Sequence, residues 1–154
     1  MKKLRILTPV IAIVFALMAC AQKPTFPSLN NQNGITTVYI SKAMLAMAGK
    51  SNILNGVPVK DIDKLESVEV ITAENQSVSQ KIQDAMSEYT RNNPDLEILL
   101  QVNEKDNNVK IYGKPIAGSS NFSVMIIHVS ESNENVLVVM KGVISPSTME
   151  NLNI

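Results

Sequence analysis

The chain has 154 residues, with 14 basic and 14 acidic side chains, one cysteine, one histidine and no tryptophan. This length suits one domain, and 45% hydrophobic residues against 18% charged ones argue against wholesale disorder. One cysteine excludes a disulfide framework or a cysteine-based zinc cluster within the chain, and one histidine excludes any site that needs two imidazoles.

The N-terminus has the pattern of a secretory signal peptide. Three cations, Lys2, Lys3 and Arg5, precede an apolar run over residues 6–19. This run is too short to span a bilayer, for which about 20 apolar residues are needed. We therefore predict a signal peptide over residues 1–19.

The apolar run ends in Leu17-Met18-Ala19-Cys20, which resembles the lipobox of bacterial lipoproteins. By that resemblance, Cys20 becomes the first mature residue and carries a diacylglycerol and an amide-linked acyl chain, which together make a stable anchor. The alternatives are a free cysteine in an ordinary signal peptide and an uncleaved anchor, and both are less consistent with the complete but short signal.

Cleavage before Cys20 would leave 135 residues with a net charge of −3, because three cations lie in the removed segment. A mildly acidic chain without a basic run is a poor nucleic-acid binder, so we expect attachment to a membrane through the lipid and no nucleic-acid partner. Residues 20–35 are rich in proline and asparagine and lack apolar periodicity, which predicts a flexible tether. No acidic cluster follows Cys20, and we therefore expect an outer-membrane lipoprotein that faces the periplasm.

Periodic patterns begin at Thr36, and we predict a single domain over residues 36–154. Ser41 can cap a first helix, and the clearest helix follows with apolar residues at helical spacing. The expected strands are residues 36–40, 67–72, 96–103, 109–112, 122–129 and 136–144, and the expected helices are residues 42–48 and 73–91, with helical turns at 59–65 and 146–152. The late strands are joined by short turns, which predicts an α+β fold with a mostly antiparallel or mixed sheet and helices packed on one face.

Three segments carry a family resemblance: residues 36–44 (TTVYISKAM), 65–71 (LESVEVI) and 136–142 (VLVVMKG). Together with the lipobox, they resemble the Bacteroidota lipoproteins classed as domain of unknown function 4252, over roughly residues 36–152. The resemblance implies a small envelope lipoprotein without an assigned catalytic motif, and it transfers no site residue to this chain.

The common catalytic and nucleotide-binding motifs are absent from the sequence. No glycine-rich phosphate loop, HExxH, Ser-x-x-Lys or Gly-x-Ser-x-Gly pattern occurs, and Asp106-Asn107-Asn108 lacks the spacing of a calcium loop. We therefore predict no catalytic, cofactor-binding or metal-binding residues, no cofactor, and a protein that is not an enzyme.

Two positions nevertheless allow a chemical interpretation. His128 shares an apolar strand face with Val124 and Ile126, and it could act as a general base or a lone metal ligand. A histidine at the sheet edge with one hydrogen bond is the preferred interpretation, because no acid–base partner is identifiable. Ser41-Lys42 could form a nucleophile and base, but a helix cap followed by a solvated lysine explains the pair better.

Methionines and carboxylates give two weaker hints. Met44 and Met47 could bind copper(I) through their thioethers, but core packing is the better explanation. A short acidic stretch could perform acid–base work or bind a cation weakly, but its interleaved lysines indicate a solvated face. The stretch comprises Asp61, Asp63, Glu66 and Glu69, with Lys60 and Lys64 between them.

The sequence thus favours a lipid-anchored, non-enzymatic binding or accessory module that binds another envelope protein, with a link to envelope stress as one role. The alternatives are an envelope hydrolase using Ser41-Lys42 or His128, and a structural subunit that pairs through an exposed edge strand.

Overall fold

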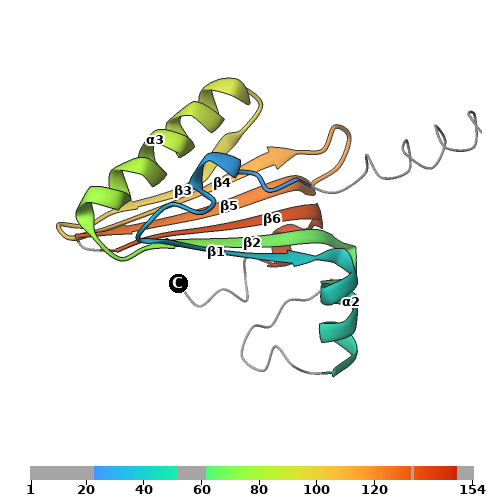
Figure 1. The fold of residues 1–154 in the computed structure, drawn as a ribbon. Helices are drawn as coiled ribbons and strands as arrows, with labels where there is room; N and C mark the ends of the chain where they lie inside the picture. The colour runs from blue at the N-terminus through green and yellow to red at the C-terminus, as the bar shows by residue number, and fades with distance from the viewer. Residues whose placement is uncertain (1–22, 52–61, 133, 149–154) are drawn as a thin grey trace, which may run out of the picture.

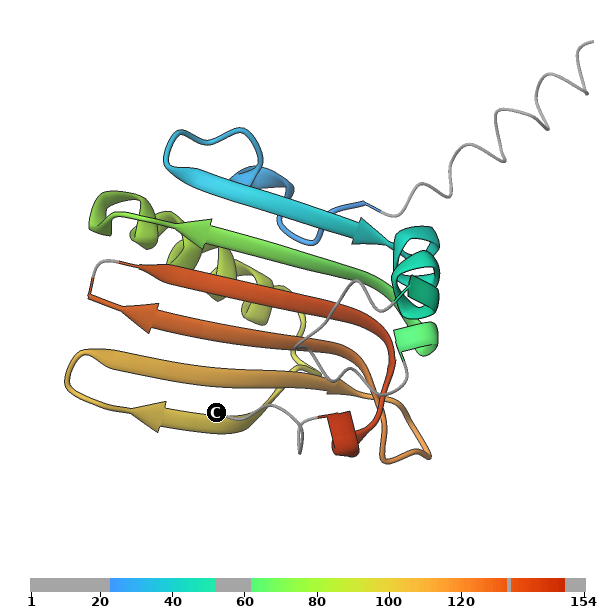
Figure 2. The same cartoon turned by 90° about the horizontal axis from the view of Figure 1, so that it is seen from below.

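Six strands form one antiparallel sheet in the computed structural model, which describes residues 23–51, 62–132 and 134–148. The strands are β1 (Ile35–Ser41), β2 (Leu65–Ala73), β3 (Glu97–Asn103), β4 (Asn107–Pro115), β5 (Phe122–Glu131) and β6 (Asn135–Ile144). Their order across the sheet is β1-β2-β6-β5-β4-β3, so β1 and β3 are the edges (Figure 2). The helices are α2 (Lys42–Ser51) and α3 (Gln76–Asn92), with 3₁₀ turns η2 (Pro27–Leu29), η3 (Ile62–Lys64) and η4 (Pro146–Thr148).

The two helices lie on opposite faces of the sheet, α3 along one face and α2 at one end of the other (Figure 1). Strand alternation sends Ile71, Ile126 and Val139 to the α3 face, where they join one buried cluster. Met125 and Met140 point to the other face and pack in a second cluster that includes Leu45 of α2. The predicted α+β class with an antiparallel sheet is confirmed, with one helix on each face rather than both on one.

Helix α3 begins three residues later than its apolar periodicity predicts. Ala73 is fully buried as the last residue of β2, and Asn75 then caps the helix, its side-chain oxygen accepting a hydrogen bond from the Val78 amide at 3.1 Å. At the other end, the Asn93 side-chain amide donates to the Tyr89 carbonyl at 2.9 Å. The helix is therefore held at both ends over the sheet.

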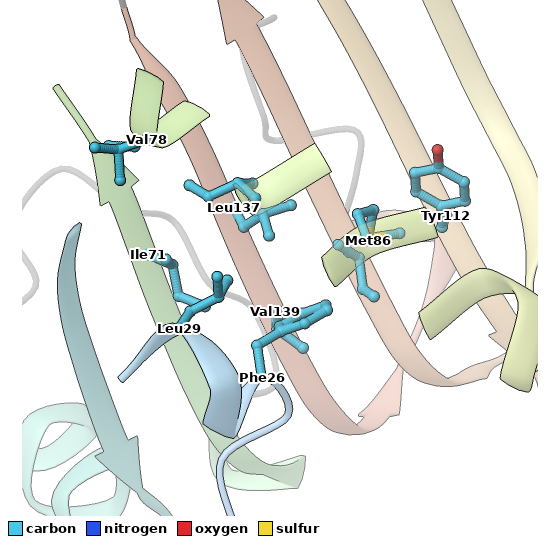
Figure 3. Packing of buried hydrophobic residues seen from close by; sticks show 11 residues of the cluster. Phe26, Leu29, Ile71, Val78, Met86, Tyr112, Leu137 and Val139 are labelled. Carbon is cyan, nitrogen blue, oxygen red and sulfur yellow. The ribbon is translucent and has the colours of Figure 1, made fainter. Parts of the chain in front are cut away.

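Residues 23–34, here called the N-terminal strap, pack on the α3 face of the sheet. Phe26 and Leu29 are 3% and 2% exposed and lie against Val139 and Ile71 in the core (Figure 3). The ring of Phe26 also packs on Tyr89, with 5.1 Å between the ring centroids. The prediction of a flexible tether over residues 20–35 is therefore wrong for the strap, because two well-spaced apolar anchors on a 3₁₀ turn bury it without helical or strand periodicity.

The predicted signal peptide and Cys20 lie outside the described residues, as do residues 52–61 and 149–154.

Candidate functional site

A cleft of about 390 Å³ opens between α3 and the strands β3 to β5. Successive turns of α3 cover the cleft with the side chains of Gln83, Met86, Ser87 and Thr90. Six side chains form its floor and wall: Asn103, Asn108, Lys110, Tyr112, His128 and Ser130. The cleft is thus largely polar, although it continues the face that holds the main apolar core.

The floor of the cleft follows from the strand register. Lys110 of β4 lies opposite His128 of β5, and Asn108 lies opposite Ser130. Residues directly opposite each other share a sheet face, so these four side chains all point towards α3. Ile126 continues the same row of β5 into the core. One sheet face therefore changes from apolar to polar along its length, and the cleft lies at the polar end.

His128 is held by a second polar side chain from the neighbouring strand. Its Nε2 lies 2.7 Å from Oδ1 of Asn135, a residue that is 1% exposed. An imidazole Nε2–H that donates to this amide oxygen leaves Nδ1 with a free lone pair. The prediction of a histidine at the sheet edge is wrong, because β5 is an inner strand, whereas the predicted shared face with Val124 and Ile126 is confirmed.

Burial lowers the pKa of His128 below its ordinary value of 6.5. The hydrogen bond to Asn135 opposes this shift, and the positive charge of Lys110 adds to it. The imidazole is therefore neutral at pH 7, and it contributes a hydrogen-bonding group rather than a charge to the cleft.

The charge of the cleft comes from Lys110, a half-buried residue. No carboxylate lines the cleft among the residues that the structure describes. By contrast, Lys114 forms an ion pair with Asp95 at 2.9 Å. Burial also raises the pKa of Tyr112, so its phenol stays protonated and can donate a hydrogen bond. The cleft therefore presents one cation, one phenol and several amides and hydroxyls.

The structure does not bring Ser41-Lys42, the alternative nucleophile and base, into this cleft. Ser41 Oγ accepts a hydrogen bond from the Met44 amide at 3.4 Å, as expected for a cap of α2. Through the register, Ser41 is level with Val124 on β5. His128 lies four residues further along that strand and three strands away from β1. Ser41-Lys42 and His128 therefore belong to separate regions.

Two interpretations of side chains outside the cleft need correction. Met44 and Met47 are exposed, so core packing does not explain them. Glu69 is 2% exposed, although a solvated face was predicted for its acidic stretch. Its Oε2 accepts a hydrogen bond from the Thr25 amide at 2.8 Å, and its Oε1 is buried without a hydrogen-bond partner among the described residues. The burial of Glu69 could have been predicted from the alternation in β2, which places Glu69 on the same sheet face as the buried Ile71.

The remaining members of the acidic stretch do not gather around a cation. Asp63 and Glu66 are exposed, and Asp61 lies outside the described residues. Within the parts of the chain that the structure describes, no group of three or more histidine, cysteine, aspartate or glutamate side chains is arranged to hold a metal ion.

The family model described as "Domain of unknown function (DUF4252)" matches residues 29–152. The chain belongs to this family. The matched DUF4252 region contains both helices, all six strands and every residue that lines the cleft. No curated protein and no solved structure matches the chain. Within the described part of this DUF4252 protein, no helix has both the length and the apolar character needed to cross a membrane.

Proposed function

We propose that this protein is a lipid-anchored binding module of the bacterial envelope, and that it holds a small hydroxylated anion in the cleft around His128. The observation that carries this proposal is the composition of the cleft, in which Lys110 is the one charged side chain among the described lining residues, beside amides and hydroxyls. A volume of about 390 Å³ is at the lower end of the range for small-molecule sites, which suits a ligand of the size of one sugar.

The polar groups of the cleft complement such a ligand. The Lys110 ammonium provides the counter-charge, and the Tyr112 phenol is a donor with little freedom to move because it is buried. Asn103 and Asn108 each offer both a donor and an acceptor, which suits a hydroxyl group. Hydrogen bonds that involve a charged group contribute more binding free energy than hydrogen bonds between neutral groups, so Lys110 is expected to determine which ligand charge the cleft prefers.

The cleft supports binding better than turnover. A hydrolase would need His128 to act as a base, and Ser130 lies two residues away on the same face. However, the Nε2 of His128 is bonded to an amide rather than a carboxylate, and burial lowers its pKa. A weak base without a carboxylate to stabilise its protonated form is a poor activator of serine.

The ligand proposal is tested by amide NMR titrations with three sugars of one size and different charge: glucuronate, glucose and glucosamine. We expect glucuronate to shift the signals of cleft residues at lower concentration than glucose, and glucosamine to bind most weakly. Lys110→Gln should remove the preference for glucuronate. Lys141→Gln is the matched control, because Lys141 lies level with Val124, away from the cleft. Equal responses to all three sugars, or an unchanged preference in Lys110→Gln, would contradict the proposal.

The membrane part of the proposal rests on Leu17-Met18-Ala19-Cys20 and places the domain at the periplasmic face of the outer membrane. It is tested by labelling cells with a clickable fatty acid. The parent protein should take up the label and fractionate with the outer membrane, whereas Cys20→Ser should do neither. Labelling of the Cys20→Ser variant would show that the anchor lies elsewhere.

A second candidate function is pairing between copies through the edge strand β3. Its side chains Ile98, Leu100 and Val102 are exposed, and residues 98–103 carry no charge that would oppose strand addition. Sedimentation of the purified protein tests this candidate. A concentration-dependent dimer that Leu100→Lys abolishes would support it, and a monomer at all concentrations would exclude it.

A further inference from the structure

We propose that helix α2 inserts its exposed methionine face into the same membrane that holds the lipid anchor. This inference rests on the proposed acylation of Cys20. It adds a second membrane contact, made by the folded domain itself, and it therefore predicts how the domain is oriented at the surface.

The first observation is the composition of the exposed side of α2. Leu45 points inwards and is buried, whereas Met44 and Met47 are 56% and 63% exposed. Ala43 and Ala46 are exposed beside them, so the exposed side chains of residues 43–47 carry no charge. An apolar helix face open to solvent loses free energy in water, and it gains free energy when it enters the boundary between headgroups and acyl chains.

The second observation is the lysine at the start of α2. Lys42 is the first residue of the helix and is exposed. A lysine at the end of a short apolar helix can extend its ammonium group to a lipid phosphate while the methionines enter the apolar layer. Asp63 and Glu66, exposed near η3, carry the opposite sign, so the apolar contact rather than net charge must supply most of the attraction.

The third observation is where the anchored end of the chain meets the domain. The Thr25 amide is bound to Glu69, which pairs with Tyr39 of β1, three residues before α2 begins. Three strand residues span about 10 Å. Cys20 is five residues before Thr25, and these residues can span at most about 18 Å.

The anchored end of the chain and α2 also lie at the same end of the sheet. In both views the first described residues lie towards the end of the sheet that carries α2 (Figures 1 and 2). A lipid on Cys20 therefore holds this end of the domain within reach of the bilayer, and α2 is the apolar surface that it brings there. A bilayer fits this surface better than a protein partner, because the exposed face is short and consists of flexible methionine and small alanine side chains.

The test places a polarity-sensitive thiol dye on the full-length protein, purified in its acylated form and reconstituted into vesicles of phosphatidylethanolamine and phosphatidylglycerol. An acylated Cys20 has no free thiol, so Met47→Cys introduces one reactive site. Lys105→Cys is the matched control, because Lys105 is exposed in the turn between β3 and β4, at the opposite end of the sheet (Figure 2). Brominated lipid acts as a quencher of dyes within the apolar layer.

We expect the dye at position 47 to emit at shorter wavelength in vesicles than in detergent-free buffer, and to be quenched several-fold more by brominated lipid than the dye at position 105. Adding Met44→Glu should reverse both effects at position 47 while the protein stays bound through its lipid. Equal emission and quenching at the two positions, with Cys20 shown by mass spectrometry to be acylated, would overturn the α2 proposal and leave the anchor intact. An unacylated Cys20 would overturn both.

Discussion

Replacing Phe26 by alanine tests whether the N-terminal strap belongs to the folded domain. Phe26 is 3% exposed, packs with Leu29 and Val139, and faces Tyr89 across 5.1 Å. Truncation of a buried phenylalanine costs about 3–5 kcal/mol of unfolding free energy. Loss of the aromatic pair contributes about 0.5–1.5 kcal/mol beyond the buried area, and this contribution is already part of the measured range. Because domains of this size are stable by about 5–15 kcal/mol, the variant should lose a large fraction of its stability.

The assay is urea unfolding of the mature protein followed by far-UV circular dichroism, with Ser28→Ala as the control. Ser28 is exposed on the same 3₁₀ turn, so its truncation should change the unfolding free energy by less than about 0.5 kcal/mol. A loss below about 0.5 kcal/mol for Phe26→Ala would refute the reasoning, because that result is expected of a side chain on a solvated tether.

Three further predictions concern stability and the cleft. The neutral form of His128 is favoured in the folded protein, so the unfolded chain binds more protons near pH 6. The contribution of His128 to the unfolding free energy should therefore be complete above pH 6.5 and should be lost as the pH decreases through the lowered pKa. In unfolding curves measured across that pH range, His128→Gln should remove this part of the pH dependence. Gly142 has a φ of 138°, and a Cβ there would meet the backbone of Lys64 and Leu65, so Gly142→Ala should clearly lower the melting temperature. Gly118→Ala is the control, because a Cβ there meets nothing within 4 Å, and this variant should show only the cost of the positive φ without a clash. Tyr112→Phe should weaken glucuronate binding by about 0.5–1.5 kcal/mol in the same NMR titration with little loss of stability, and an unchanged affinity would exclude the phenol as a donor to the ligand.

The elements with strong local patterns could be predicted from the sequence. The apolar runs over residues 122–129 and 136–144 and the helical spacing of Val78, Ile82 and Met86 place β5, β6 and α3 correctly, because the apolar pattern of a segment reports which of its sides are buried. The strand ends extend beyond the apolar positions, since backbone pairing continues where side chains turn polar. β4 is the clearest case, running over Asn107–Pro115 instead of residues 109–112.

The strap and the cleft could not be predicted, since both depend on contacts between distant residues. Nothing local in the sequence shows that Thr25 meets Glu69, 44 residues away. The partnership of Lys110, His128 and Asn135 likewise follows from the register of three strands rather than from any motif. Asparagine and lysine side chains along a strand are ordinary surface residues until the helix that covers them is in place.

The most direct test of anion binding in the cleft uses the chain's one histidine, whose imidazole signals in a proton–carbon NMR spectrum need no assignment. The pKa of His128 is measured by pH titration without ligand and with saturating glucuronate. Without ligand, we predict a pKa below 6.5; with glucuronate bound beside Lys110, the added negative charge should raise it. Imidazole signals that titrate identically with and without glucuronate, and do not shift when glucuronate is added, would contradict the account.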